Sequence, residues 1–187
     1  MNEHLVVSAH NKMSKKLKIR ESRPSELAEI EALYAEAFPD EDLLPLVRDL
    51  LNDPVVAISL VGVIDSRIVG NAILTKCGVA SCCVNAALLG PVAVAPVWQR
   101  QGIGSSIVRA GLRQMEDAGV HRVYVLGDPV YFGRLGFLAE SLIEPPFPLP
   151  SEWGGAWQSQ ALGENTTSYR GKLSVPPQWL QPALWTA

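Results

Sequence analysis

The stretch of sequence that decides the fold runs from residue 92 to residue 106 and reads Val92-Ala93-Val94-Ala95-Pro96-Val97-Trp98-Gln99-Arg100-Gln101-Gly102-Ile103-Gly104-Ser105-Ser106. Its first residues alternate valine with alanine and carry no polar side chain, which is typical of a buried strand. The proline and the two glycines that follow indicate a turn, and the small residues after them begin a helix. The segment therefore predicts a strand, a turn and a helix in direct succession.

The start of this helix has the chemistry of an anion-binding site. Gly102 and Gly104 lack side chains, so backbone N–H groups at the helix start stay accessible, and the helix dipole adds partial positive charge there. No acidic residue occurs between Gln99 and Gln114, and the cationic residues of that stretch are Arg100, Arg109 and Arg113. We therefore expect a ligand that carries phosphate groups at this position.

Two common phosphate-binding motifs do not fit the segment. A Walker loop requires a lysine after its last glycine, and the segment contains no lysine. The dinucleotide-binding fingerprint requires a third glycine or alanine, but the residue at that position is Ile107. The pattern that remains is Gln-x-x-Gly-x-Gly after a Val-x-Val strand and a proline. An ordinary helix start is the alternative interpretation.

The flanking segments alternate strand and helix patterns. From the spacing of apolar residues and the positions of glycine and proline we expect strands at 17–21, 55–64, 67–76, 84–95, 121–126, 157–162 and 168–175, and helices at 24–38, 43–51, 103–118 and 129–134. The apolar residues of 103–118 form one stripe, Asp65-Ser66 fits a two-residue hairpin turn, and Asp128 is the expected N-cap of the last helix. The strand–helix–strand unit around 103–118 is expected to be parallel, and the other pairings mostly antiparallel. The fold class is therefore α/β (α+β), with a mixed, mostly antiparallel central sheet flanked by helices.

The composition excludes several function classes. The chain has 187 residues, 48% of them hydrophobic, and its net charge of −3 argues against a broadly basic surface that binds nucleic acid. No charge occurs from Cys77 to Trp98, but the glycines and prolines in this run indicate buried strand and loop rather than a membrane span. The cysteines and histidines form no metal-binding spacing. Without an apolar leader segment, we expect a cytoplasmic protein.

Two segments together resemble the GNAT superfamily of N-acetyltransferases. The Gln-x-x-Gly-x-Gly segment resembles the acetyl-CoA pyrophosphate loop of that superfamily. The segment Gly127-Asp128-Pro129-Val130-Tyr131-Phe132-Gly133-Arg134-Leu135-Gly136-Phe137 is similar to the Gly-Asp-Pro-x-Tyr-Tyr-x-Arg-Phe-Gly-Phe stretch of one bacterial branch. The order of the expected elements is also the GNAT order. The resemblance extends over about residues 17–175 and is dense at 89–137.

The chain is expected to have three parts. Residues 1–16 are expected to be a disordered or flexible leader, and Met13 offers a second possible start. Residues 17–144 are expected to form the acetyl-CoA-binding core. Residues 145–187, rich in proline and tryptophan, are expected to form an extension that completes the sheet.

The resemblance also implies where acetyl-CoA binds. Members of the family separate the two middle strands of the sheet, here 84–95 and 121–126, and the pantetheine arm of the cofactor lies in the opening. A bulge near Gly90 is expected to direct a backbone N–H at the thioester carbonyl. No metal is expected. The residues expected to bind the cofactor are Val92, Ala93, Val94, Gln99, Arg100, Gln101, Gly102, Ile103, Gly104 and Ser105.

The sequence departs from the family pattern at the residue that supplies the catalytic acid. Phe132 stands where many members carry a tyrosine, so the hydroxyl is missing. The neighbouring Tyr131 either acts as the general acid or is an aromatic that packs in the core or against the cofactor. No carboxylate occurs between Asp65 and Glu116, which excludes a general base on the central strands.

The sequence indicates the acceptor-binding residues less clearly than the cofactor-binding residues. Residues 21–53 carry ten acids and two bases, and within them Asp40, Glu41 and Asp42 are expected to attract a cationic amine, with a solvated loop as the alternative. Trp153, Trp157, Trp179 and Trp185 either pack the C-terminal extension over the sheet or line an acceptor pocket or a homodimer contact.

These observations lead to one functional hypothesis and two alternatives. The chain is expected to be an acetyl-CoA-dependent N-acetyltransferase that moves an acetyl group to a primary amine, on a small molecule or a protein, by direct attack in a ternary complex. The first alternative, motivated by Phe132, is a catalytically weak or inactive CoA-binding sensor or regulatory module. The second, a nucleotide-binding α/β domain, is opposed by Ile107 and by the missing lysine.

Overall fold

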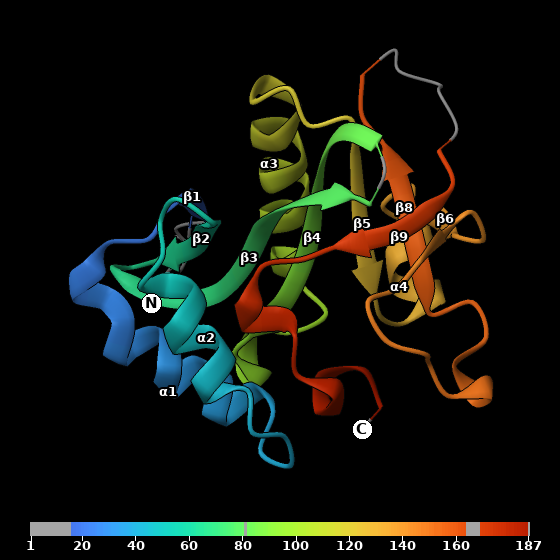
Figure 1. The fold of residues 1–187 in the computed structure, drawn as a ribbon. Coiled ribbons are helices and arrows are strands. Elements are labelled where there is room, and N and C mark those ends of the chain that lie inside the picture. The colour runs from blue at the N-terminus through green and yellow to red at the C-terminus, as the bar shows by residue number, and fades with distance from the viewer. Residues whose placement is uncertain (1–15, 81, 164–168, 187) are drawn as a thin grey trace, which may run out of the picture.

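A twisted sheet runs through the centre of the molecule (Figure 1). This computed structural model describes residues 16–80, 82–163 and 169–186. The strands follow the order β1-β2-β3-β4-β5-β8-β6, and β9 pairs with both β3 and β7. Most neighbours are antiparallel and β4 is parallel to β5, which confirms the predicted fold class. The strands are β1 (Lys18–Glu21), β2 (Ala57–Ile64), β3 (Arg67–Val79), β4 (Cys82–Val94), β5 (Arg122–Leu126), β6 (Leu138–Ala139), β7 (Ile143–Glu144), β8 (Trp157–Ala161) and β9 (Gly171–Ser174).

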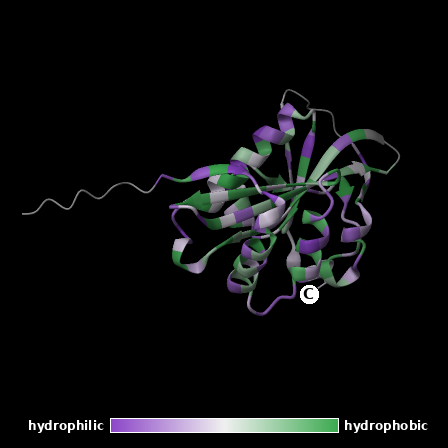
Figure 2. Ribbon diagram, turned by 90° about the vertical axis from the view of Figure 1, so that its left-hand side faces the viewer, coloured by the Kyte–Doolittle hydropathy of each residue, from purple (hydrophilic) through white to green (hydrophobic). Residues whose placement is uncertain are grey.

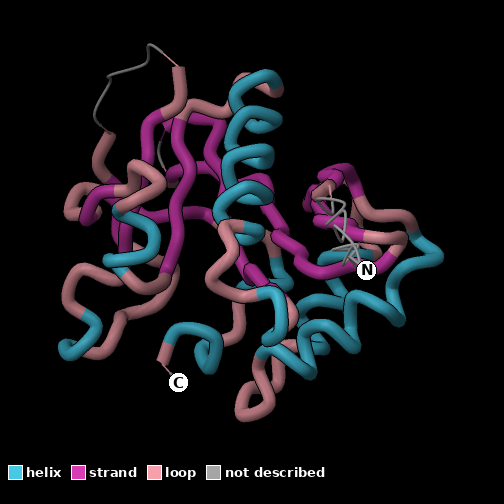
Figure 3. The backbone as a smooth tube through the Cα atoms, turned by 180° about the vertical axis from the view of Figure 1, so that it is seen from behind, coloured by secondary structure: helices cyan, strands magenta, loops and turns pink. Residues whose placement is uncertain are grey.

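The two faces of the sheet pack against different helices. Because successive side chains of a strand point to opposite faces, Ile73 and Leu74 of β3 enter two separate hydrophobic clusters. Helices α1 and α2 pack with the first cluster, and α3 packs with the second and lies across the sheet when the molecule is seen from behind (Figure 3). Figure 2 shows hydrophobic residues gathered in the central strands. The helices are α1 (Leu27–Ala37), α2 (Leu44–Leu51), α3 (Ile103–Asp117) and α4 (Pro129–Gly133), with short 3-10 turns at Pro24–Glu26, Pro96–Trp98, Ser151–Trp153, Pro177–Trp179 and Pro182–Trp185.

The β2–β3 hairpin is closed by two residues, as the sequence predicts. Asp65 and Ser66 have φ angles of 48° and 63°, so both occupy the left-handed region. Two consecutive residues in this region form the turn that matches the right-handed twist of the flanking strands. Strand β3 therefore pairs with β2 along one edge, and it pairs with β4 along its other edge.

The middle strands β4 and β5 pair over only part of their length. Residues 86–89 of β4 pair with residues 122–125 of β5. Beyond Leu89, β4 continues along β3 as far as Val94, while β5 ends at Leu126 and the chain turns into α4. The two strands therefore separate after Leu89, as the predicted fold requires.

A β-bulge lies where the strands separate. On β3, Leu74 faces Leu89 and Ala72 faces Val92, so two residues of β4, Gly90 and Pro91, lie opposite the single residue between them. The φ angle of Gly90 is +143°, a value that residues with a Cβ rarely adopt. Gly90 therefore makes this bulge possible at the end of the paired segment.

The last part of the chain adds strands at two places in the sheet. β8 pairs with β5, and β9 pairs with the end of β3. The uncharged run that begins at Cys77 supplies the end of β3, strand β4 and the turn at 96–98. In the parts of the chain that the structure describes, no helix has the length and apolar character needed to cross a membrane. The expected leader lies, except for Lys16, outside the described residues.

Candidate active site

The separation of β4 from β5 exposes one edge of the β4 backbone. The N–H of Ala95 donates to the Val69 oxygen on β3 at 3.0 Å, so Ala95 faces β3. Because backbone groups alternate between the two edges of a strand, those of Val92 and Val94 face the opening. The Val94 oxygen already accepts a hydrogen bond of 3.0 Å from the side-chain amide of Gln99. The N–H groups of Val92 and Val94 and the Val92 oxygen therefore face the opening.

The loop between β4 and α3 has a conformation that collects backbone N–H groups. Arg100 and Gly102 have φ angles of +59° and +78°, and left-handed residues in a turn point neighbouring N–H groups toward one concave side. The side-chain amide of Gln101 donates to the Val97 oxygen at 3.1 Å. Gln99 and Gln101 therefore brace the loop with their side chains, and the anion-binding capacity lies in the backbone.

Helix α3 presents free N–H groups at its start. Its first helical hydrogen bond runs from the N–H of Ser106 to the Gly102 oxygen at 3.0 Å, so the N–H groups just before Ser106 have no acceptor in the helix. These N–H groups belong to Ile103, Gly104 and Ser105. The Ile103 side chain is buried under the helix. Arg100 is exposed in the turn just before it, and Arg109 and Arg113 are exposed further along α3. This arrangement can bind a phosphate or pyrophosphate group.

The two aromatic residues at the acid position point in different directions. The carboxylate of Asp128 accepts a hydrogen bond of 2.8 Å from the N–H of Val130 and caps α4, as predicted. The ring of Phe132 is buried and lines the cavity between the separated strands. The hydroxyl of Tyr131 lies against the first turn of α3, where a Cβ on Gly104 would be 2.8 Å from it. Tyr131 therefore adjoins the anion-binding side of the opening.

A cavity of about 290 Å³, the inner cavity, lies between the separated strands. Strands β4 and β5, together with Gly127 and with Phe132 of α4, form one side of it. The α1–α2 loop and the C-terminal segment form the other side, which includes Trp179 and Trp185. These two tryptophans thus pack the C-terminal segment and also line a pocket. The lining residues are Phe38, Glu41, Leu43, Leu88, Leu89, Gly90, Pro91, Val92, Val125, Leu126, Gly127, Phe132, Trp179, Leu184 and Trp185.

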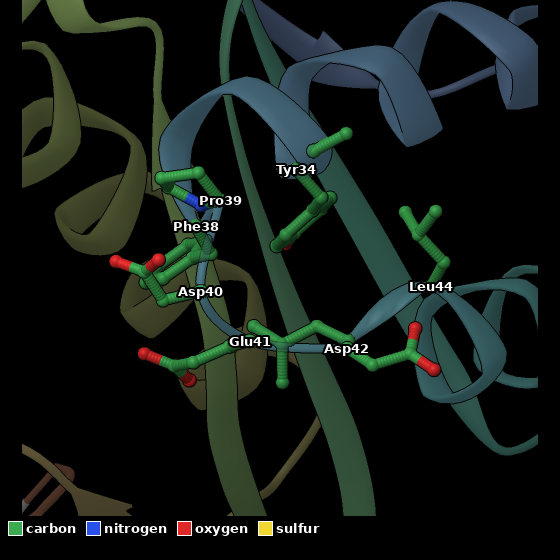
Figure 4. Close-up of a pocket in the computed structure, with 9 residues that line it drawn as sticks. Tyr34, Phe38, Pro39, Asp40, Glu41, Asp42 and Leu44 are labelled. Atoms are coloured by element: carbon green, nitrogen blue, oxygen red, sulfur yellow. The ribbon is translucent and has the colours of Figure 1, made fainter.

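A second cavity, of about 360 Å³, lies under the α1–α2 loop and is called the outer cavity (Figure 4). All three acidic residues predicted to attract the acceptor line it, but only Glu41 lines the inner cavity too. Figure 4 shows the carboxylates of Asp40 and Glu41 on one side of the loop and that of Asp42 on the other. The other lining residues are Tyr34, Ala35, Phe38, Pro39, Leu43 and Leu44.

A buried polar network that the sequence analysis missed holds the bulge. The Tyr34 hydroxyl lies 2.8 Å from the Pro91 oxygen and 2.9 Å from Asn71 Oδ1, so its single proton serves two acceptors. The Asn71 amide donates to Ser59 Oγ and to the Leu60 oxygen, both at 2.8 Å. Burial raises the pKa of Tyr34 well above its ordinary value, so the hydroxyl stays a donor. Asn71, the one amide in the apolar run 68–74, was the available sequence signal.

Comparisons with known proteins agree with this geometry. The family model for the acetyltransferase (GNAT) family matches residues 26–137. The uncharacterized N-acetyltransferase YjhQ of Escherichia coli (strain K12) is 27% identical over 156 residues, which cover 80% of this chain and 86% of YjhQ. The uncharacterized N-acetyltransferase YhbS of the same strain is 28% identical over 120 residues, which cover 64% of this chain and 72% of YhbS.

Two solved structures share the fold. The crystal structure of Escherichia coli YhbS in complex with CoA superposes with a TM-score of 0.80 at 23% identity, covering 92% of this chain and 96% of YhbS. A GNAT family acetyltransferase from Brucella melitensis in complex with acetyl-CoA superposes with a TM-score of 0.71 at 25% identity, covering 88% of this chain and 99% of that protein. Because the family model spans more than half of the chain, the chain belongs to the acetyltransferase (GNAT) family and is an N-acetyltransferase of that family.

Proposed function

We propose that this chain transfers the acetyl group of acetyl-CoA to a primary amine by direct attack, with both substrates bound together. The observation that carries the proposal is the opening between β4 and β5, which joins the anion-binding start of α3 to the inner cavity. One ligand with phosphates at one end and a thioester at the other fits both places. The CoA and acetyl-CoA complexes of the two structural neighbours support the same ligand.

The cofactor contacts follow the exposed backbone. The amide groups of the pantetheine arm pair with Val92 and Val94 along the open edge of β4, and the side chain of Ala93 is buried beneath. The pyrophosphate binds the N–H groups from Arg100 to Ser105, where the helix dipole and the exposed arginines favour negative charge. Phe132 packs beside the thioester end.

The reaction needs a donor for the carbonyl oxygen and a path for protons. Attack by the amine forms the C–N bond and places negative charge on the thioester oxygen, which a backbone N–H of Gly90 or Val92 stabilises. Pro91 has no N–H to give. Collapse of the intermediate breaks the C–S bond and releases the CoA thiolate. An alkylamine with a pKa of about 10.4 must first lose a proton, and Glu41 is the carboxylate at the inner cavity that can accept it.

The thiolate leaving group takes a proton from Tyr131 or from water. The Tyr131 hydroxyl lies beside Gly104, on the cofactor side of the opening, which suits a role toward the cofactor sulfur or simple packing against the cofactor. An acid role affects kcat, whereas a packing role affects the Kd for acetyl-CoA.

Phe132 favours a second candidate function. Its ring lines the inner cavity at the position where a tyrosine hydroxyl would serve as the general acid, so the acid is missing there. A CoA-binding sensor or regulatory module would bind the cofactor and transfer nothing. An assay of a panel of amines at saturating acetyl-CoA distinguishes the two functions, because a sensor would give no acetylated product with any of them.

Calorimetric titration and thermal unfolding test the proposed cofactor directly. We expect acetyl-CoA and CoA to bind and to raise the melting temperature, because a ligand that binds only the folded state stabilises it. NAD and ATP, which lack the pantetheine arm, are the controls and should leave the melting temperature unchanged. If no CoA thioester stabilises the chain, the proposal is wrong.

A further inference from the structure

The lining of the inner cavity is nearly free of charge. Among its fifteen described lining residues, Glu41 is the only one with an ionisable side chain, and no lysine, arginine or histidine is present. The remaining members are aliphatic, aromatic, glycine or proline residues. The side away from the cofactor is formed by Phe38, Leu43, Trp179, Leu184 and Trp185 together with Glu41.

Both indole N–H groups of the lining and the Pro91 oxygen already have hydrogen-bond partners within the protein. The indole N–H of Trp179 donates to Thr75 Oγ1 at 3.0 Å, and that of Trp185 donates to the Trp179 oxygen at 3.0 Å. The Pro91 oxygen lies within hydrogen-bond distance of the Tyr34 hydroxyl. The two tryptophans can therefore offer only carbon atoms and ring faces to a bound molecule.

These surroundings discriminate between classes of amine. A hydroxyl group carried into the cavity would lose its hydrogen bonds to water, and among the described lining side chains only the Glu41 carboxylate, which is needed for the ammonium group, could accept one in return. A carboxylate would meet Glu41 and no cation. A second ammonium group would have to share one carboxylate. An alkyl or aryl group, in contrast, gains from the removal of apolar surface from water and from contact with aromatic rings.

We propose that the acceptor is a small primary amine whose substituent is apolar, an arylalkylamine or an alkylamine without a carboxylate, with Glu41 pairing with its ammonium group. This inference rests on the proposed function and names the substrate class of that site. The volume of about 290 Å³, part of which the thioester occupies, suits a small molecule.

Matched pairs of amines test the class. Initial rates of CoA release at saturating acetyl-CoA are compared for phenethylamine against phenylalanine, which adds only a carboxylate. Hexylamine is compared with aminohexanol, which adds a hydroxyl, and with hexamethylenediamine, which adds an ammonium. Lysine amide that is acetylated on its α-nitrogen, with its ε-amine free, represents a protein lysine. We expect kcat/KM to fall by about tenfold or more from each apolar amine to its polar partner, and the lysine amide to be no better than hexylamine.

Binding without turnover gives an independent readout. Because Trp179 and Trp185 line the cavity, titration of phenethylamine into the CoA complex should change tryptophan fluorescence, and phenylalanine at the same concentrations should not. This measurement detects the apolar amine even in a chain that transfers nothing, so it separates a failure of the substrate class from a failure of catalysis.

Two pairs of variants connect the effect to the cavity. Leu184→Ala removes a lining side chain and should raise the KM for phenethylamine by about threefold to tenfold, whereas Leu180→Ala removes a side chain that is 54% exposed and outside the cavity. Glu41→Gln should raise the KM for both apolar amines by about fivefold and also lower kcat, because Glu41 is the proposed proton acceptor. The control Glu36→Gln removes an exposed charge of α1 that lines neither cavity and should leave KM unchanged.

The outcomes separate the two proposals. Faster turnover and tighter binding of the hydroxylated, carboxylated or doubly charged partner, or of the lysine amide, would overturn the substrate class and leave acetyl transfer intact. Failure of acetyl-CoA to bind would overturn the proposed function and this inference with it. A fluorescence response to phenethylamine without turnover supports the substrate class and counts against catalysis.

Discussion

At the scale of single residues, Tyr131 and Phe132 are neighbours in α4 whose side chains point to different parts of the opening. One position along a helix is a rotation of about 100°, and the two rings meet edge to face with centroids 4.9 Å apart. Phe132 therefore enters the inner cavity while the Tyr131 hydroxyl contacts the first turn of α3. The sequence alone predicts the missing hydroxyl at Phe132, but the direction of Tyr131 depends on how α4 packs against α3.

Tyr131→Phe removes one hydroxyl and tests its role as the acid. A general acid typically contributes a factor of about 100 or more, so we expect kcat to fall by at least tenfold with the Kd for acetyl-CoA within twofold of the parent. Stopped-flow rates and calorimetry measure the two quantities. An unchanged kcat removes Tyr131 from the mechanism, and a weaker Kd alone assigns it to cofactor packing.

Glu140 is a buried carboxylate with a structural role. Its side chain is 5% exposed and accepts hydrogen bonds from the N–H groups of Leu142 and Ile143 and from the Ser159 hydroxyl. Burial raises the pKa of this carboxyl. The hydrogen bonds and the nearby charge of Arg122 together lower it by more than burial raises it, so the pKa lies below its ordinary value of 4.5. The contribution to stability is therefore complete above that value and is lost as the pH falls through the lowered pKa.

Glu140→Gln should lower the free energy of unfolding by about 1–3 kcal/mol at neutral pH, because the charge-assisted hydrogen bonds are lost. The difference from the parent should shrink in strongly acidic solution, where the parent carboxylate is protonated too. Urea unfolding at both pH values measures it. Glu144→Gln, an exposed change on β7, is the control. A penalty that is independent of pH would show that the carboxylate charge plays no part.

At the scale of elements, the turn before α3 carries the proposed pyrophosphate site. Gly102 and Gly119 flank α3 with φ angles of +78° and +75°, and nothing lies within 4 Å of a Cβ placed on either. Alanine at each position therefore causes the same backbone strain, about 1–2 kcal/mol, without a clash. We expect both variants to lose similar stability, but only Gly102→Ala to lose acetyl-CoA affinity, by calorimetry. Equal affinities would contradict the placement of the pyrophosphate.

Two buried tyrosines test the network that holds the β4 bulge. Tyr34→Phe leaves Asn71 Oδ1 and the Pro91 oxygen without their donor, and should cost about 1–3 kcal/mol of unfolding free energy and lower kcat. Tyr124→Phe removes a hydroxyl that has no hydrogen-bond partner among the described residues, and should be neutral or stabilising. Denaturant unfolding of both variants makes the comparison. Equal losses would contradict a specific role for the network.

The sequence was a good guide to elements with a strong local pattern. The apolar stripe of α3, the Asp128 cap of α4 and the Asp65-Ser66 turn were all predicted, because each depends on residues near one another in the chain. The Tyr34–Asn71 network was not predicted, since it joins residues 37 positions apart. The inner cavity was missed for the same reason, because it combines the α1–α2 loop, β4, β5 and the C-terminal segment.

At the scale of the whole molecule, the charge distribution follows the two proposed substrates. The exposed Arg100 lies in the turn before α3, where phosphates are proposed to bind, Arg109 and Arg113 follow along the same helix, and the acidic loop between α1 and α2 lines the outer cavity, with Glu41 reaching the inner cavity too. The net charge of −3 conceals this division. The C-terminal segment is held to the rest of the molecule by tryptophan packing, because Trp185 is 1% exposed and packs against both Trp157 and Trp179.

The most direct test of acetyl transfer follows both products of the reaction in one vessel. The purified chain is incubated with saturating acetyl-CoA, with and without an apolar primary amine, while free CoA thiol and acetylated amine are quantified. We expect CoA release to depend on the amine and to match the acetylated amine in molar amount. Thiol release that is the same without amine, or the absence of acetylated amine, would contradict direct transfer.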